Sequence, residues 1–166
     1  QSDDNLWIAN GGHNSGRKWP ILFAGLMLGH EGMMHVKATF QEDQQTYYGK
    51  GFAGQRALWT IAPGNANRCH EEVDPKTWDT FGDQRGNNGR KAEGYRKLNG
   101  PTWVGQALAA RLTGTVDNWN HPAYFDYVDR WWRETRSARP FVKEMWERYR
   151  DRADAIGQAV QRKRSR

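Results

Sequence analysis

The most apolar run of the chain extends from Trp19 to Leu28 and follows a polar, glycine-rich segment that begins at Asn10. Pro20 lies near the start of this run, where a helix accepts proline because its missing N–H would be unpaired there in any case. Apolar residues fall on nearly every side of the predicted helix, which indicates a buried and central position. The run is far too short to cross a bilayer, which takes about 20 residues.

Three further segments near the C-terminal end show apolar residues at helical spacing. The first begins at Pro101 and stops at Gly114, the second covers residues 121–136, and the third covers residues 140–160. The short connection between the last two predicts that they form an antiparallel pair against the helix at Trp19–Leu28.

Residues 49–100 show no helical period and are rich in glycine. We predict one long irregular loop there, anchored to the body by scattered aromatic side chains, with one short helix near Pro75–Phe81. The sequence therefore predicts an all-α protein of about four helices, organised as a single helical domain over residues 1–161.

Charge is the most pronounced feature of the C-terminal end. The chain carries a formal net charge of +6, and Arg162, Lys163, Arg164 and Arg166 supply much of it from residues 162–166. We interpret this segment as a solvated basic tail, with a phosphate-binding arm as the alternative, so nucleic acid is not the expected partner. The mean hydropathy of −1.00 is low for a compact enzyme, and nine tryptophans offset part of that deficit.

Two features bear on the cellular context. Cys69 is the single cysteine, which excludes an internal disulfide. The chain begins with Gln1, which we interpret as a processed form or an excised piece; removal of a signal peptide would make the protein secreted or periplasmic. No apolar run is long enough to predict a membrane span.

The first polar cluster, His13, Asn14, Ser15, Arg17 and Lys18, precedes the helix at Trp19–Leu28. Free N–H groups and the helix dipole attract anions at such a position, and basic side chains add to the attraction. Asn14 or Ser15 acting only as a helix cap is the alternative. Neither glycine-rich nucleotide motif occurs, so no nucleotide site is predicted.

The second cluster contains His30, Glu31 and His35. The zinc-protease pattern needs two histidines four residues apart on one helical face, whereas these are separated by five positions. We therefore predict no metal and no cofactor.

The third cluster places Glu42 and Asp43 beside Tyr47 and Tyr48. Two carboxylates framed by aromatic rings suit sugar chemistry, in which one group is the acid and the other the base or nucleophile. A lyase would instead use a tyrosine or histidine to remove a proton next to a carboxylate. A solvated acidic turn is the alternative without chemistry.

The segments NGGHNSGRKWPILFAGLML, FQEDQQTYY, PTWVGQALAARLTG and WNHPAYFDYVDRWW together resemble the helical-toroid portion of bacterial polysaccharide-degrading proteins. That group includes heparinase-like and alginate-lyase-like enzymes and several glycoside hydrolases. The resemblance implies that the chain forms part of an (α/α) toroid. It also implies that the site residues lie on loops at one rim and face a saccharide groove: His13, Arg17, Glu42, Asp43 and Tyr47.

We therefore expect a polysaccharide-active protein, either a glycoside hydrolase or a lyase, and the basic composition favours an acidic glycan. The expected catalytic residues are Glu42, Asp43, His13 and Tyr47, and the expected substrate-binding residues are Arg17, Lys18, Tyr48, Trp59 and Trp78. The alternative is a non-catalytic interaction subunit whose partner is another protein chain. A binding groove requires Tyr48, Trp59 or Trp78 exposed along one cleft, whereas a subunit requires them spread over flat surfaces.

Overall fold

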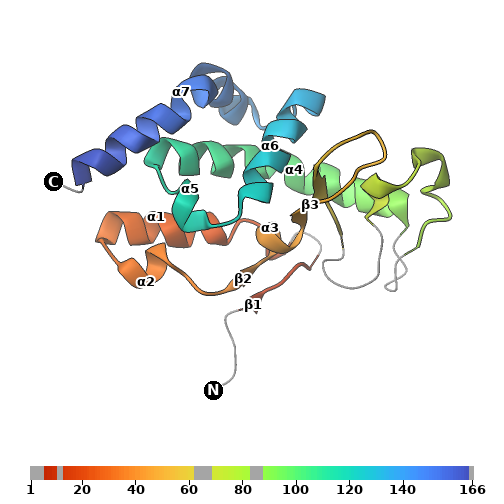
Figure 1. Ribbon diagram of the computed structural model, residues 1–166, viewed down its shortest axis with the longest axis horizontal. Helices are drawn as coiled ribbons and strands as arrows, with labels where there is room; N and C mark the ends of the chain where they lie inside the picture. The colour runs from red at the N-terminus through yellow and green to blue at the C-terminus, as the bar shows by residue number, and fades with distance from the viewer. Residues whose placement is uncertain (1–5, 11–12, 62–68, 83–87, 165–166) are drawn as a thin grey trace.

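The computed structural model describes residues 6–10, 13–61, 69–82 and 88–164, and over these ranges the protein is mostly helical (Figure 1). The long helices are α1 (Lys18–Leu28), α4 (Gly89–Thr113), α6 (Pro122–Thr135) and α7 (Pro140–Arg164). The short ones are α2 (Glu31–Met34), α3 (Gln41–Gln44), α5 (Val116–Trp119) and the 3-10 turns η1 (His70–Glu72) and η2 (Pro75–Thr77).

Two small sheets accompany the helices. Strand β1 (Leu6–Trp7) pairs in parallel with β2 (Thr39–Phe40), and β3 (Thr46–Tyr48) pairs antiparallel with β4 (Ala57–Trp59). The prediction of a mostly helical protein with four long helices is confirmed, but the fold is not strictly all-α.

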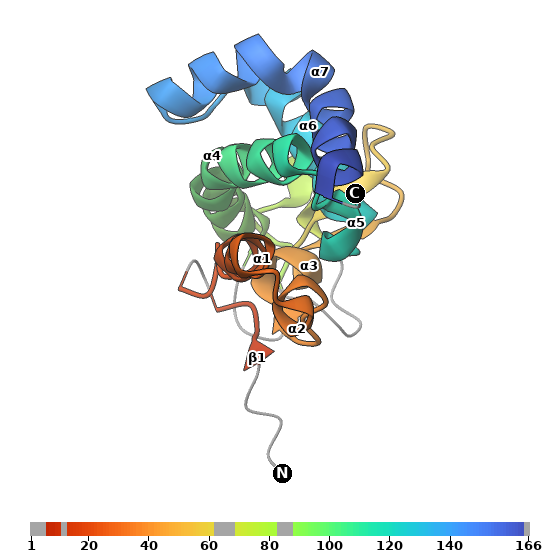
Figure 2. The same cartoon turned by 90° about the vertical axis from the view of Figure 1, so that its left-hand side faces the viewer.

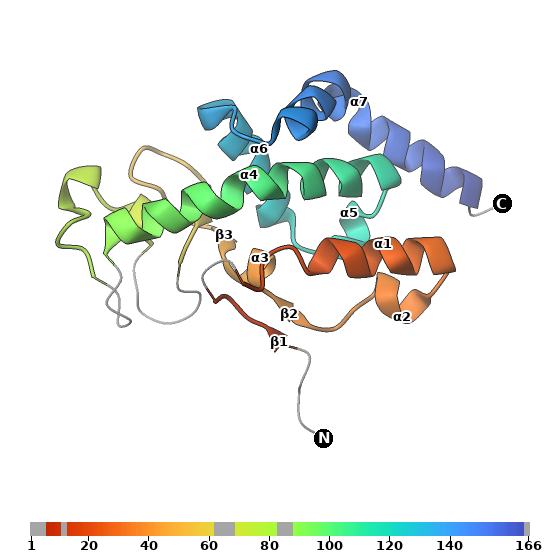
Figure 3. The same cartoon turned by 180° about the vertical axis from the view of Figure 1, so that it is seen from behind.

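Helix α4 is the central element of the molecule. It lies between α7 on one side and α1 on the other, as the end-on view shows (Figure 2), and the short helix α5 contacts both α4 and α1. Seen from behind, α4 runs along the long axis of the molecule (Figure 3).

Helix α7 packs along α4 at a very close crossing. A Cβ added to Gly157 would overlap the carbonyl oxygen of Arg111, and one added to Gly114 would lie 2.5 Å from the carbonyl oxygen of Gly157. The predicted antiparallel pairing of the last two helices is therefore wrong: α7 packs mainly on α4. Helix α6 meets α7 through Trp132 and Trp146, whose ring centroids are 5.5 Å apart.

Helix α1 has nearly the predicted bounds but not the predicted central position. Leu22 and Leu26 are buried, whereas Phe23, Met27 and Leu28 are 43%, 68% and 74% exposed. An all-round apolar sequence predicts burial on all sides, but in this fold only one face of α1 meets neighbouring elements. The other face remains an apolar surface.

The loop predicted at 49–100 is shorter than expected because α4 begins at Gly89, well before Pro101. Asn88 caps the helix by accepting the N–H of Lys91 at 2.8 Å. Gly100 and Pro101 disfavour a helix locally, but Gly100 lies so close to the Trp131 ring that a Cβ would come within 2.5 Å of it. Packing of the helix against α6 therefore outweighs the weak local propensity.

The remainder of the predicted loop contains ordered elements, namely β4, η1 and η2. The predicted short helix near Pro75–Phe81 corresponds to η2.

The basic segment 162–166 differs from a solvated tail over the part that the structure describes. Helix α7 continues through Arg164, and the Arg164 guanidinium donates to the carbonyl oxygen of Leu26 at 2.6 Å. Cations stabilise a helix C-terminus because the last carbonyl groups are unpaired and carry partial negative charge. The end of α7 is thereby fastened to the end of α1, and residues 165–166 lie outside the described ranges.

Candidate functional site

The predicted carboxylate Asp43 and the predicted ligand-binding Lys18 bind each other inside the protein. The Lys18 ammonium lies 2.5 Å from Asp43 Oδ2 and donates to the Trp119 carbonyl oxygen at 2.5 Å. Trp119 Nε1 donates to Asp43 Oδ1 at 3.0 Å. Lys18 is only 5% exposed, so this cluster fastens α1, α3 and α5 together rather than facing a ligand.

Glu42, the second predicted carboxylate, is completely buried. Its Oε1 accepts the N–H of Gly16 at 2.6 Å, and its Oε2 has no hydrogen-bond partner within the described ranges. Burial raises the pKa of Glu42 to about 7, and the neighbouring carboxylate of Asp43 contributes in the same direction. Glu42 is therefore an interior group that is protonated under mildly acidic conditions.

This burial predicts a specific pH dependence of stability. A folded-state pKa of about 7 against an ordinary 4.5 means that the folded protein holds a proton that the unfolded chain has released. The free energy of unfolding should then fall as the pH rises from 4.5 to 7, by up to about 3 kcal/mol. Glu42→Gln, which retains the acceptor for Gly16, should remove this fall in chemical denaturation measured across that range.

The matched control for this prediction is Glu144→Gln, the same chemical change at an exposed position of α7. It should retain the pH profile of the wild type. A Glu42→Gln protein with the wild-type slope between these pH values would show that another group takes up the proton.

The remaining predicted catalytic residues do not converge on Glu42 and Asp43. His13 and Arg17 are exposed, and in the described part of the chain no hydrogen bond or ion pair joins their side chains to either carboxylate. Tyr47 donates to Glu72 Oε1 at 3.0 Å. Burial, with Cys69 and Glu72 nearby, raises the pKa of Tyr47 far above its ordinary value, which disfavours the predicted role as a base.

Two of the predicted binding aromatics, Trp59 and Trp78, make contacts within the protein. Trp59 is completely buried in the core, and Trp78 donates from Nε1 to the His70 carbonyl oxygen at 2.8 Å. The groove expected from Arg17, Lys18, Tyr48, Trp59 and Trp78 is thus not formed, because the core and the Asp43 cluster take up Trp59 and Lys18. Of this set, Tyr48 is the residue that lines the hollow described next.

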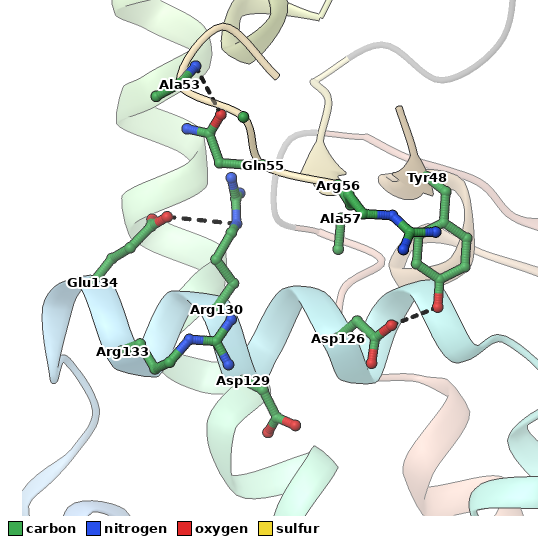
Figure 4. A pocket seen from close by; sticks show the side chains of 11 residues that line it. Tyr48, Ala53, Gln55, Arg56, Ala57, Asp126, Asp129, Arg130, Arg133 and Glu134 are labelled. Atoms are coloured by element: carbon green, nitrogen blue, oxygen red, sulfur yellow. Dashed lines mark hydrogen bonds and ion pairs between the residues drawn. The ribbon is translucent and has the colours of Figure 1, made fainter. Parts of the chain in front are cut away.

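An open hollow of about 720 Å³ lies between the β3–β4 connection and the outer face of α6 (Figure 4). We call it the α6 hollow. One wall is formed by Tyr48 and residues 53–57. The opposite wall is formed by side chains of α6: Asp126, Asp129, Arg130, Arg133 and Glu134.

Two carboxylates of the α6 hollow, Asp126 and Asp129, accept hydrogen bonds from protein partners. Tyr48 donates to Asp126 Oδ2 at 2.6 Å, and this hydrogen bond raises the pKa of Tyr48. Asp129 accepts from Arg150 at 2.5 and 2.9 Å and from Arg111 at 3.0 Å. Asp129 therefore presents no uncompensated charge to a ligand, whereas Asp126, which is bonded to the neutral Tyr48 hydroxyl, keeps its negative charge.

Arg130 forms a rigid part of the wall. Its Nη2 donates to both carboxylate oxygens of Glu71, at 2.6 and 2.8 Å, and Glu71 Oε2 also accepts the N–H of Trp59 at 2.6 Å. A more distant ion pair, at 3.7 Å, joins Arg130 Nε to Glu134. Two charge-assisted hydrogen bonds from one buried nitrogen hold Arg130 against Glu71.

Arg56 and Arg133 differ from the other charged groups of the α6 hollow. Both are exposed, and among the residues that the structure describes neither forms an ion pair. The ring of Tyr48 is 48% exposed beside them. The hollow therefore offers two uncompensated guanidinium groups and one accessible aromatic ring.

The sequence contained a signal for this wall that our prediction did not use. Asp126, Asp129 and Arg133 recur at helical spacing along 121–136, opposite the apolar stripe. The pattern identifies them as the outer face of an amphipathic helix, and it does not indicate that the β3–β4 connection passes over that face.

The second cluster of the sequence is a surface feature. His35 Nε2 lies 3.4 Å from Glu31 Oε2 with both side chains exposed, and His30 Nδ1 accepts the N–H of Met33 at 3.3 Å as a helix cap. Within the described ranges, no three histidine, cysteine, aspartate or glutamate side chains are grouped as metal ligands. None of the described helices is both long and apolar enough for a bilayer crossing.

Comparison with known proteins finds no matching family model, no matching curated protein and no matching solved structure.

Proposed function

We propose that this chain binds an acidic polysaccharide in the α6 hollow. The observation that carries the proposal is the pair of uncompensated guanidinium groups, Arg56 and Arg133, on opposite walls beside the exposed ring of Tyr48. Guanidinium groups bind carboxylates through paired hydrogen bonds, and aromatic rings pack on the apolar faces of sugars.

The size and the remaining lining support a saccharide ligand. Ligand sites in proteins commonly measure roughly 300–1,000 Å³, and the α6 hollow measures about 720 Å³. Asp126, Asp129 and Arg130 are held by protein partners and remain at the wall as polar groups for sugar hydroxyls. The resemblance of the sequence to polysaccharide-degrading toroid proteins supports the same class of ligand, and with it a secreted or periplasmic location.

The lining of the α6 hollow favours binding over a reaction on the glycan. Hydrolysis of a glycosidic bond requires two carboxyl groups roughly 5–9.5 Å apart across the bond. The exposed ones in the lining, Asp126 and Glu134, are eight positions apart on α6, about 12 Å along its axis, so hydrolysis is disfavoured. A lyase reaction with Tyr48 as base is disfavoured, because its raised pKa keeps the hydroxyl protonated. Following reducing ends and unsaturated products on the same glycan panel separates these two reactions.

The binding proposal predicts that Arg56→Gln/Arg133→Gln weakens binding of a carboxylated glycan about 10- to 100-fold. Each substitution removes one or two charge-assisted hydrogen bonds from the ligand. Isothermal titration calorimetry with glucuronoxylan and polygalacturonate measures the effect, with mannan as the neutral glycan and polyuridylate as a polyanion without sugar carboxylates.

The matched control is Arg17→Gln/Arg152→Gln, which removes the same charge from exposed positions outside the α6 hollow. It should leave the dissociation constant within about twofold of the wild type. An equal loss in both double variants, no binding of any carboxylated glycan, or tighter binding of polyuridylate would each contradict the proposal.

The exposed apolar face of α1 favours a second function, that of an interaction subunit. Phe23 and Met27 lie four positions apart on this face, with Leu28 beside them at its end. Contiguous apolar residues on a surface are typical of protein interfaces. Light scattering coupled to size exclusion tests this function: an isolated chain that is a stable monomer at all concentrations argues against self-association through α1.

A further inference from the structure

A second hollow adjoins the α6 hollow along the same helix. It measures about 540 Å³ and lies between the C-terminal half of α6 and the N-terminal half of α7; we call it the α7 hollow. Asp129 and Arg133 line both hollows, so the two hollows are adjacent and these side chains lie between them.

The carboxylate between the two hollows, Asp129, does not repel an anionic ligand, because arginines neutralise its charge. Asp129, the carboxylate at that point, is bound by Arg150 from α7 and by Arg111 from α4. Its charge is compensated twice, and Arg133 beside it has no ion pair within the described ranges. A ligand that carries a carboxylate in the α6 hollow can therefore continue past Asp129.

The floor of the α7 hollow is aromatic. The rings of Trp132 and Trp146 are 5.5 Å apart, and both are nearly buried, at 5% and 3% exposed. The Arg136 guanidinium lies 5.4 Å from the centroid of the Trp132 ring, and that of Arg150 lies 5.6 Å from the Trp146 ring. Stacking on a ring restricts each guanidinium and keeps its hydrogen-bond donors at the wall.

The uncompensated charges of the two hollows differ. In the α6 hollow the two cations Arg56 and Arg133 outnumber the one carboxylate, Asp126, that has no cationic partner among the described residues. In the α7 hollow Arg136 is opposed by Glu147 and Asp151, exposed carboxylates of α7 that form no ion pair in the part of the chain the structure describes. The second hollow therefore combines donors and acceptors without favouring an anion, which suits the hydroxyls of an uncharged sugar.

We propose that the α7 hollow is a second sugar subsite that takes an uncharged unit of a chain whose acidic unit occupies the α6 hollow. This inference rests on the proposed function and deepens it: the ligand is a mixed polysaccharide, with acidic units next to neutral ones, rather than a polymer of acidic sugars alone. Arg136 and Glu147 recognise the neutral unit from opposite walls.

Ligands of different length test the inference. Aldobiouronic acid, with one glucuronate and one xylose, fills the α6 hollow, whereas aldotetraouronic acid, with one glucuronate and three xyloses, also reaches the α7 hollow. By titration calorimetry we expect the wild type to bind the longer ligand about tenfold more tightly. Arg136→Gln should remove this gain and leave the affinity for aldobiouronic acid unchanged, and the second measurement reports that the variant is folded.

The control is Arg139→Gln, an exposed arginine three positions further along that does not line the α7 hollow. It should retain the full gain. Tetragalacturonic acid should gain little over digalacturonic acid, because Glu147 and Asp151 repel its additional carboxylates.

Three results would overturn the subsite: equal affinity of the wild type for both aldouronic acids, an Arg136→Gln protein that keeps the gain, or the same gain with tetragalacturonic acid. In each case binding of the short acid persists and the proposed function survives. Absence of binding to either aldouronic acid and to polygalacturonate would instead defeat the proposed function itself.

Discussion

Replacing Glu71 with alanine is expected to lower the free energy of unfolding by about 3–5 kcal/mol. Glu71 is 7% exposed and accepts from Arg130 at 2.6 and 2.8 Å and from the N–H of Trp59 at 2.6 Å. Arg96 lies 3.6 Å away and also loses a counter-charge. The loss is large because the buried Arg130 keeps only the more distant Glu134, at 3.7 Å, as a counter-charge and the buried N–H of Trp59 loses its acceptor. Urea denaturation at neutral pH measures it.

Two further variants make this prediction specific. Glu71→Gln keeps the shape and one acceptor, so its loss should be smaller than that of the alanine variant. Glu144→Ala removes an exposed carboxylate from α7 and should change the stability by less than about 0.5 kcal/mol. A Glu71→Ala protein as stable as Glu144→Ala would mean that Arg130 finds solvent or another partner.

Trp131→Ala should destabilise the protein by a similar amount, about 3–5 kcal/mol, the usual cost of emptying a large aromatic site. The ring is 2% exposed, packs against Gly100, and has the Arg96 guanidinium 4.9 Å from its centroid. Its Nε1 also donates to the Ser137 carbonyl oxygen at 3.0 Å. Thermal unfolding followed by circular dichroism is the measurement.

Phe141→Ala is the matched control, since this ring at the start of α7 is 70% exposed. Its midpoint should stay near that of the wild type, whereas that of Trp131→Ala should drop by several degrees. Equal midpoints in the two variants would place Trp131 outside the core.

The sequence predicted the helices better than their places in the fold. The bounds of α6 and α7 follow from a regular apolar stripe and from prolines at the first helical positions, which are local signals. The start of α4 was missed because Gly100 and Pro101 resemble a break, and the contact of Gly100 with Trp131 that stabilises the helix there joins segments far apart in the chain. The apolar sequence of α1 did not reveal which face would remain uncovered.

The candidate site was predicted only at Tyr48, for a related reason. Residue types suited to chemistry, such as Lys18, Glu42 and Trp59, are equally suited to buried polar networks and cores once partners are present. For Lys18 the partners are Asp43 and the carbonyl oxygen of Trp119, a residue far along the chain. Conversely, Arg56 and Arg133 look like ordinary surface cations until the fold places them on one hollow.

The close contact of α7 with α4 at Gly157 links the spacing of these two helices to the position of Arg150. The backbones touch there, so no side chain at residue 157 can be accommodated without moving the helices apart. Arg150 lies seven positions away on the same helix, roughly 10 Å along its axis. A substitution that moves α7 away from α4 at Gly157 would also displace Arg150, which binds Asp129 in the wall of the α7 hollow. Gly157, which does not line the α7 hollow, thus fixes the spacing of α4 and α7, and α7 forms one wall of that hollow.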